Sequence, residues 1–145
     1  MKKLSLLLLP LFLAGCATSN ALIGELPQIQ DPNKAATVVP IRISSIVGLA
    51  NPYKVAIDGK DIHSIGSGEH SEFLVSEGAH TISVKCFGGW YPTTKVSSVS
   101  FMAERNKSYY FEIAPNMKCA GIVQIDESKA TELLKKNKKL DLNKH

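Results

Sequence analysis

The chain has no long hydrophobic run of the kind that reveals a membrane-spanning protein. Its longest apolar run, Leu4–Leu13, is only ten residues long and contains Pro10. A transmembrane helix needs roughly 20 predominantly apolar residues to cross about 30 Å of hydrocarbon. We therefore expect no spanning helix. The length of the run suits the apolar part of a secretory signal peptide instead.

The sequence also offers little that could perform chemistry. The spacing of the four histidines matches no metal-binding motif; they are His63, His70, His80 and His145. No Gly-x-Ser-x-Gly nucleophile elbow is present. Gly66-Ser67-Gly68 is too short for a phosphate-binding loop. Asp58 and Asp61 are expected to shape a turn through side-chain hydrogen bonds rather than to bind calcium, and His80 to form hydrogen bonds at the core edge. We expect no catalytic residue, metal or cofactor, and a hydrolase remains only a remote alternative.

Charge is distributed unevenly along the chain. Residues 129–145 contain six lysines against Glu132 and Asp141, whereas residues 16–128 are mildly acidic. A nucleic-acid-binding protein shows its basic residues as a patch on the folded domain. We therefore expect no nucleic-acid partner.

The N-terminus carries the most informative motif. Met1-Lys2-Lys3 precedes the apolar run and Leu13-Ala14-Gly15-Cys16 ends it, which is the pattern of a secretory signal peptide. The cysteine directly after the small residues resembles the lipobox of bacterial lipoproteins. The resemblance implies that residues 1–15 are a signal peptide that is removed, and that Cys16 carries fatty acyl chains such as palmitate. Stable membrane attachment needs about two acyl chains, and a triacylated cysteine meets this condition.

The residues after Cys16 predict the location of the domain and a tether. Ala17, rather than Asp, follows the cysteine, and by resemblance to enterobacterial sorting rules this favours the outer membrane over the inner membrane, with the domain facing the periplasm. Residues 16–36 show no sustained period and contain Gly24 and two prolines, so we expect a flexible tether spanning about 25 Å. The alternative is that the apolar residues of this segment dock on the domain: Leu22, Ile23, Leu26 and Ile29.

Two further cysteines, Cys86 and Cys119, remain once Cys16 is lipidated. An even pair in an oxidising compartment is expected to form a disulfide. Closing a loop of about 33 residues would stabilise the fold by roughly 3–4 kcal/mol in the chain-entropy model. Two buried free thiols are the alternative, and a metal pair is disfavoured because no Cys-x-x-Cys spacing accompanies them.

Residues 37–127 have the pattern of a β-domain. Alternating apolar and polar residues predict short strands over 38–46, 53–57, 62–65, 72–75, 80–87, 96–102, 108–114 and 121–126. Asp58-Gly59 is a strong hairpin signal, and a second hairpin is expected about Glu104–Lys107. No ten-residue helical pattern falls between the strands, so a parallel sheet is disfavoured. The sequence predicts an all-β fold, a small antiparallel β-sandwich of seven or eight strands.

Residues 128–145 predict a basic C-terminal amphipathic helix or tail. Apolar and small residues follow helical spacing behind a possible N-cap at Ser128: Ala130, Leu133, Leu134, Asn137 and Leu140. We favour a terminal helix that packs Leu133 and Leu134 on the sheet while its lysines stay in water. The alternative is a helix on membrane phosphates or an anionic polymer.

Three turn motifs resemble those of a known domain type. Val55–Lys60 resembles the strand and Asp-Gly-Lys hairpin of PEGA-type domains, and Ser76–His80 differs from the Pro-Glu-Gly-Ala motif at one position. Glu104–Phe111 resembles the turn and aromatic pair of a related group of small bacterial lipoproteins of unknown function. The likeness covers roughly residues 38–126. It implies a transthyretin-like sandwich that serves as an interaction or surface module, with no catalytic residues and with a positive φ at Gly78.

The segment best suited to binding is Phe87–Pro92, which holds the only tryptophan, Trp90, and Tyr91 beside Cys86. Aromatic side chains on a rigid loop can stack on sugars or anchor a protein partner; alternatively, Trp90 closes one end of the core. We expect a lipid-anchored, periplasm-facing interaction module of the bacterial cell envelope without catalysis, whose partner is an envelope protein or a peptidoglycan-associated assembly. The alternative is a lysozyme-inhibitor-like or carbohydrate- or peptidoglycan-binding lipoprotein.

Overall fold

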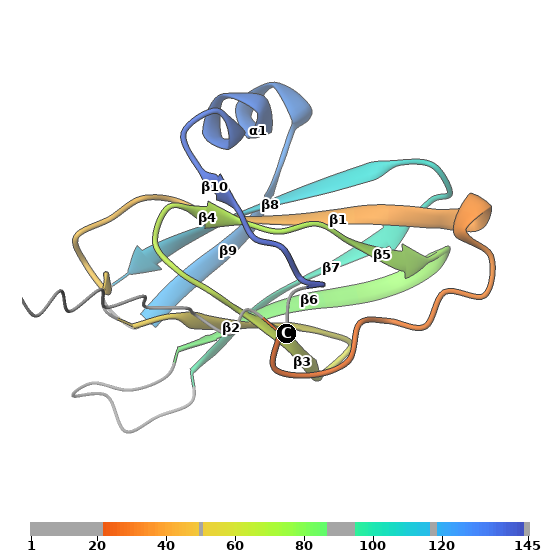
Figure 1. Cartoon of the computed structure of the whole chain (residues 1–145), viewed down its shortest axis with the longest axis horizontal. Coiled ribbons are helices and arrows are strands. Elements are labelled where there is room, and N and C mark those ends of the chain that lie inside the picture. Colours follow the sequence, from red (N-terminus) through yellow and green to blue (C-terminus); the bar gives the residue numbers. More distant parts are fainter. Residues whose placement is uncertain (1–21, 50, 87–94, 117–118, 144–145) are drawn as a thin grey trace, which may run out of the picture.

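The computed structural model describes residues 22–49, 51–86, 95–116 and 119–143, which form two packed β-sheets with one α-helix outside them (Figure 1). One sheet has the strand order β3-β2-β6-β7; the other has the order β10-β4-β1-β8-β9, with β5 also paired to β1. The all-β sandwich with a C-terminal helix is thus confirmed. The elements are a 3-10 helix Pro32–Lys34, β1 Ala35–Arg42, β2 Tyr53–Ile57, β3 Lys60–Ile65, β4 Glu69–His70, β5 Phe73–Ser76, β6 Gly78–Cys86, β7 Val96–Ala103, β8 Ser108–Asn116, β9 Cys119–Ile125, α1 Glu127–Leu134 and β10 Lys138–Lys139.

The hairpin of β2 and β3 forms where the sequence predicts it. Ile57 pairs with Lys60, and the two residues between them have positive φ angles, 49° at Asp58 and 79° at Gly59. A two-residue turn of this kind matches the twist of the flanking strands, and Asp-Gly is a preferred pair for it. Gly78, at the start of β6, has the expected positive φ (133°).

The prediction of a second hairpin is wrong, because β7 and β8 lie in different sheets. β7 pairs with β6, whereas β8 pairs with β1 and β9. The Glu104–Lys107 turn therefore carries the chain from one sheet to the other. Backbone hydrogen bonds fix this turn against β1, from Asn106 N to Ala35 O (2.8 Å) and from Thr37 N to Lys107 O (2.9 Å).

Two strand pairings differ from an all-antiparallel sandwich, and the shorter one joins β10 to β4. β1 runs parallel to β8 over Thr37–Arg42. The two strands are far apart in the sequence and no short turn joins them, so the pairing direction is not fixed by a hairpin. The sequence has no helical pattern between its predicted strands, which disfavoured a parallel sheet, so the parallel β1–β8 pair was not predicted.

The core lies between the two sheets. Ile82 and Val84 of β6 and Phe111 and Ile113 of β8 are all completely buried, as the two-residue period of each strand requires. Phe101 of β7 extends this layer, with its ring centroid 5.0 Å from that of Phe111. Burying one such side chain stabilises the fold by about 1.5–3 kcal/mol.

The N-terminal part of the described chain docks on this core. Leu22 forms an antiparallel bridge with His63 of β3, and the backbone N–H groups of Ile23 and Gly24 both donate to Ile62 O, at 2.8 and 2.9 Å. Leu22 and Leu26 pack against the core cluster. For these residues the structure therefore follows the docking alternative rather than a flexible tether.

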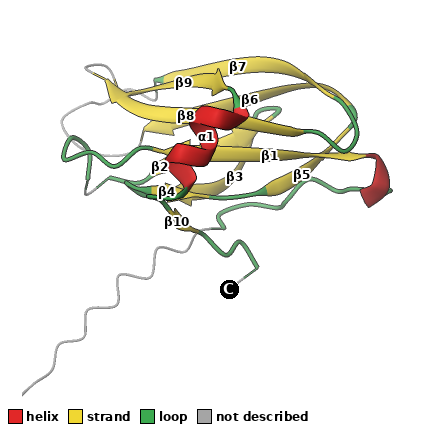
Figure 2. Ribbon diagram, turned by 90° about the horizontal axis from the view of Figure 1, so that it is seen from above, coloured by secondary structure: helices red, strands yellow, loops and turns green. Residues whose placement is uncertain are grey.

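The C-terminal helix α1 packs on the outer face of the β1–β8 sheet (Figure 2). Leu133 and Leu134 contact a small cluster that includes Val39 and Ile41, as the favoured prediction requires. The N-cap is Asp126 rather than Ser128, since its Oδ1 accepts from Lys129 N at 2.8 Å.

The predicted helix is too long at its C-terminal end, because α1 ends at Leu134. The chain then turns and forms β10 beside β4. Leu140 and Leu142 enter the main core cluster and are 8% and 5% exposed. Among the described residues, no helix has the length and apolar character needed to span a membrane.

Candidate functional site

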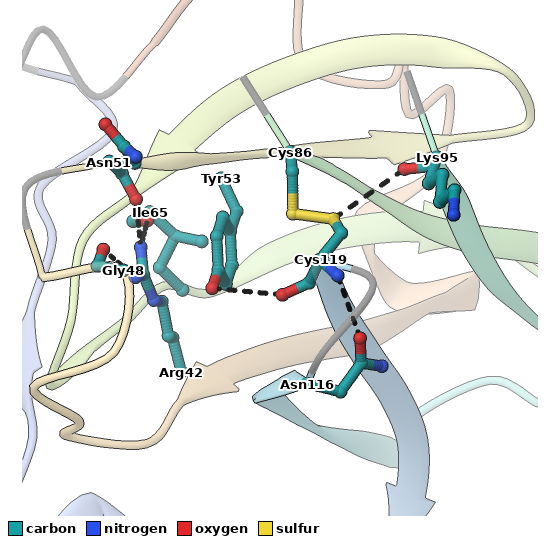
Figure 3. The surroundings of a disulfide bond; sticks show 9 residues. All are labelled: Arg42, Gly48, Asn51, Tyr53, Ile65, Cys86, Lys95, Asn116 and Cys119. Atoms are coloured by element: carbon teal, nitrogen blue, oxygen red, sulfur yellow. Dashed lines mark hydrogen bonds between the residues drawn. A yellow bond between two sulfur atoms is a disulfide. The ribbon is translucent and has the colours of Figure 1, made fainter. Parts of the chain in front are cut away.

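The disulfide predicted between Cys86 and Cys119 is present. Cys86 ends β6 and Cys119 begins β9, so the bond joins the two sheets at one end of the sandwich, with the Cα atoms 5.7 Å apart. Tyr53, which pairs with Cys86 across the sheet, donates its hydroxyl to Cys119 O at 3.3 Å (Figure 3). We call this the disulfide end of the sandwich.

Arg42 is a fully buried cation at the same end, although it alternates with Ile41 and Ile43 in the sequence as a polar residue. Its guanidinium donates to three backbone carbonyls, Ile65 O (3.0 Å), Asn51 O (2.9 Å) and Gly48 O (2.7 Å) (Figure 3). The guanidinium carbon lies 3.6 Å from the ring centroid of Tyr53. Burial lowers the pKa of Arg42, and the nearby Tyr53 and Glu69 oppose this shift. Hydrogen-bonded carbonyls and an aromatic face are the partners that make a buried guanidinium tolerable.

The carbonyls that Arg42 binds belong in part to the β1–β2 loop, residues 43–52. This loop carries three exposed apolar side chains, Ile46, Val47 and Leu49, which are 91%, 65% and 63% exposed. The backbone that carries them is fixed by its own hydrogen bonds, including Leu49 N to Ile46 O (3.3 Å). Ser45 is further held by a reciprocal pair of hydrogen bonds with the Ser67 hydroxyl. We call Ile46, Val47 and Leu49 the apolar turn.

A second notable surface is the side of the sandwich formed by β7 and β9 (Figure 2). In the described part of the chain, β7 pairs only with β6 and β9 only with β8, so each ends its sheet. Neither strand contains a charged residue or a proline. Natural proteins usually protect edge strands with charges, prolines or bulges, and these two strands have no such charge or proline.

Within the described ranges, Ser71 and His63 form a serine–histidine pair, but it is closed to solvent. Ser71 Oγ lies 2.7 Å from His63 Nε2, and both residues are completely buried. Burial lowers the pKa of His63 to about 4, with the Ser64 carbonyl opposing the shift. The other ring nitrogen, Nδ1, lies 3.3 Å from that carbonyl. The neutral ring with its proton on Nδ1 satisfies both contacts, since Nε2 then accepts from the serine hydroxyl.

Asp58 lies in the predicted turn, but its side chain bonds to β6 rather than within the turn. Its Oδ1 accepts from Thr81 N at 2.9 Å, and its Oδ2 lies 2.7 Å from His80 Nδ1. His80 also contacts Ser76 O through Nε2, at 2.9 Å, and so holds the hydrogen-bonded edge position expected of it. Asp61 forms ion pairs with Lys54 and Lys85 instead. Over the described ranges, no cluster of three His, Cys, Asp or Glu residues could hold a metal ion.

Three sequence-predicted site residues lie outside the described residues: Cys16, Trp90 and Tyr91. Their predicted roles stay predictions. The strands on either side of the Trp90 segment are described, and β6 ends at Cys86, at the disulfide end. Comparison with protein-family models and with curated proteins finds no match to the chain.

Proposed function

We propose that the protein is a lipid-anchored, periplasm-facing interaction module of the bacterial outer membrane, without catalysis. Its partner is an envelope protein that pairs with the uncharged edge strands β7 and β9. The proposal joins the lipobox-like motif at Cys16 to two strand edges that have no partner among the described residues.

The observation that carries the proposal is the pair of unprotected edges. β7 has eight residues and β9 has seven, and neither has a charged side chain. An edge strand presents a row of backbone donors and acceptors that another chain can complete by adding a strand. The opposite side of the sandwich is different, because Leu22–Gly24 covers β3 and β10 is formed by Lys138 and Lys139.

The docked N-terminal segment supports the anchored part of the proposal. Cys16 is only six residues from Leu22, where the described fold begins. Six residues reach about 20 Å when fully extended. An acylated Cys16 would therefore hold the sandwich close to the bilayer surface, within reach of other membrane-attached proteins.

The buried polar residues support a role without chemistry. A nucleophile and its base must reach the substrate, and the Ser71 hydroxyl and the His63 ring are both shielded from water. His80 and Asp58 are both engaged by backbone groups, the Ser76 carbonyl and the Thr81 N–H.

A site-specific photocrosslinker in intact cells tests the proposal. The crosslinker is placed at Gln124 on β9, and at Glu132 on α1 as a control that is also exposed. We expect one envelope protein to be captured from Gln124 and not from Glu132, with a lower yield when Ser98→Lys adds a charge to the β7 edge. Equal capture from both positions, or a yield that Ser98→Lys leaves unchanged, would contradict an edge-strand partner. Capture of glycan alone would favour the carbohydrate-binding alternative.

A further inference from the structure

The apolar turn is the most exposed group of large hydrophobic side chains in the described chain. Ile46 is 91% exposed, and Val47 and Leu49 lie within three residues of it. Isolated exposed apolar residues are common on protein surfaces. Three on a single turn are a concentrated patch, and such patches mark contacts with another protein or a membrane.

Hydrogen bonds from the buried Arg42 hold the backbone of the turn. Gly48 lies between the apolar residues with a φ of 71°, and its carbonyl accepts from the buried Arg42 at 2.7 Å. The same guanidinium holds Asn51 O, which fixes the following part of the loop. The side chains of the turn therefore point into solvent without needing any ordering step before binding.

The loop that carries the apolar turn has no charged side chain that would oppose its contact with a hydrocarbon phase. The ten residues Ile43–Pro52 contain no charged side chain. Arg42, just before the loop, is fully buried and bonded to carbonyls. The turn could enter the boundary between headgroups and acyl chains without dehydrating an ion.

The first described residues, Leu22–Gly24, run along β3 beside the same end of the sandwich. From Leu22 to Gly24 the chain runs antiparallel to β3, from His63 towards Asp61. From Gly24 back to Leu22, the backbone thus advances along β3 in the direction of Ile65. The Ile65 carbonyl is bound by the same guanidinium that binds Gly48 O. Leu22, the first described residue, therefore lies two β3 positions from Ile65, at the end of the sandwich that carries the disulfide and the apolar turn.

We propose that Ile46, Val47 and Leu49 insert into the bilayer that holds the lipid anchor, as a second attachment point that fixes the orientation of the sandwich. The inference rests on the proposed function, because it needs acylation of Cys16. About 20 Å of extended chain between Cys16 and Leu22 allows the disulfide end to reach the surface. With that end on the membrane, the far ends of β6 and β7, where Gly78 pairs with Ala103, point into the periplasm.

Tryptophan fluorescence with the full lipidated protein tests the inference. The protein is purified from cells fed labelled palmitate and reconstituted in phosphatidylethanolamine–phosphatidylglycerol vesicles whose acyl chains carry bromine, a quencher of tryptophan. Leu49→Trp places the probe on the apolar turn. Met102→Trp is the matched control, since both original side chains are 63% exposed and Met102 lies at the opposite end of β7, paired with Ala79. Emission is compared with that of the unsubstituted chain, which contains Trp90.

We expect brominated lipid to quench most of the emission that Leu49→Trp adds and little of that added by Met102→Trp. Equal quenching of the two probes, or no quenching of either in protein that carries the palmitate label, would overturn the membrane contact and leave the anchor standing. Protein without label at Cys16 would overturn the proposed anchor and this inference together.

Discussion

Arg42 and Tyr53 come from different sheets and stack on each other, with 3.6 Å between the guanidinium carbon and the ring centroid. Arg42 ends β1 and Tyr53 begins β2. The tyrosine hydroxyl donates a hydrogen bond to Cys119 O of β9. Cys119 is in turn bonded to Cys86 of β6 by the disulfide. The two sheets are therefore joined by polar and covalent links at the end that carries the apolar turn.

Replacing Arg42 with methionine should destabilise the fold by about 3 kcal/mol or more, because three carbonyls lose their donor and each buried unpaired group costs about 1–3 kcal/mol. Chemical denaturation measures the free energy of unfolding. Arg105→Met is the control, since Arg105 is exposed in the turn after β7 and its loss should change stability by less than about 0.5 kcal/mol. Similar small effects of both changes would show that Arg42 does not hold the loop.

The protein should become less stable as the pH is lowered from neutral, because of His63. Burial lowers the pKa of this ring from 6.5 to about 4, so as pH falls the unfolded chain binds the proton before the folded chain does. The contribution of His63 to the free energy of unfolding is fully present above about pH 6.5. It is lost as the pH falls towards 4, and the total loss is roughly 3 kcal/mol.

The variant His63→Gln isolates this contribution, because carboxylates and His70 titrate in both chains. Unfolding free energies at pH 7 and pH 4 should fall less in the variant than in the original chain. Parallel losses in the two chains would show that His63 is not the source.

Gly48→Ala should destabilise the protein more than Gly59→Ala. Both glycines have positive φ, 71° and 79°, so both substitutions cost about 1 kcal/mol in backbone strain. Only at Gly48 would the new Cβ meet a neighbour, the Tyr53 hydroxyl at 2.9 Å. Thermal unfolding of the two variants should therefore give the lower midpoint for Gly48→Ala, and equal midpoints would contradict the close packing under the apolar turn.

The N-cap of α1 is tested by Asp126→Ala and Ser128→Ala. Asp126 Oδ1 accepts from Lys129 N, and losing such a cap costs about 1 kcal/mol. Ser128 is exposed within the first turn, so its substitution should be close to neutral. Urea denaturation of the pair decides the point; a larger loss at Ser128 would restore the assignment suggested by the sequence.

Local patterns predicted the local structure well. The alternation over Tyr53–Ile57 and the turn at Asp58-Gly59 both depend on neighbouring residues, and both are found at the expected positions. The disulfide followed from an even cysteine count in an exported chain.

Features that depend on the rest of the fold were not predictable from local pattern. Glu104–Lys107 has the composition of a hairpin turn, but nothing in those residues tells whether the next strand joins the same sheet. Arg42 occupies a polar position in an alternating strand, and only the carbonyls of Gly48 and Ile65, distant in sequence from each other, explain its burial. Leu140 followed helical spacing by chance and instead fills the core beyond the end of α1.

The central claim is that a lipid on Cys16 holds this sandwich at the membrane, and metabolic labelling measures it most directly. Cells grown on labelled palmitate are fractionated, and the original chain is compared with Cys16→Ala. The account predicts label and membrane association for the original chain and the loss of both in the variant. Label that persists in Cys16→Ala, together with continued membrane association, would contradict it.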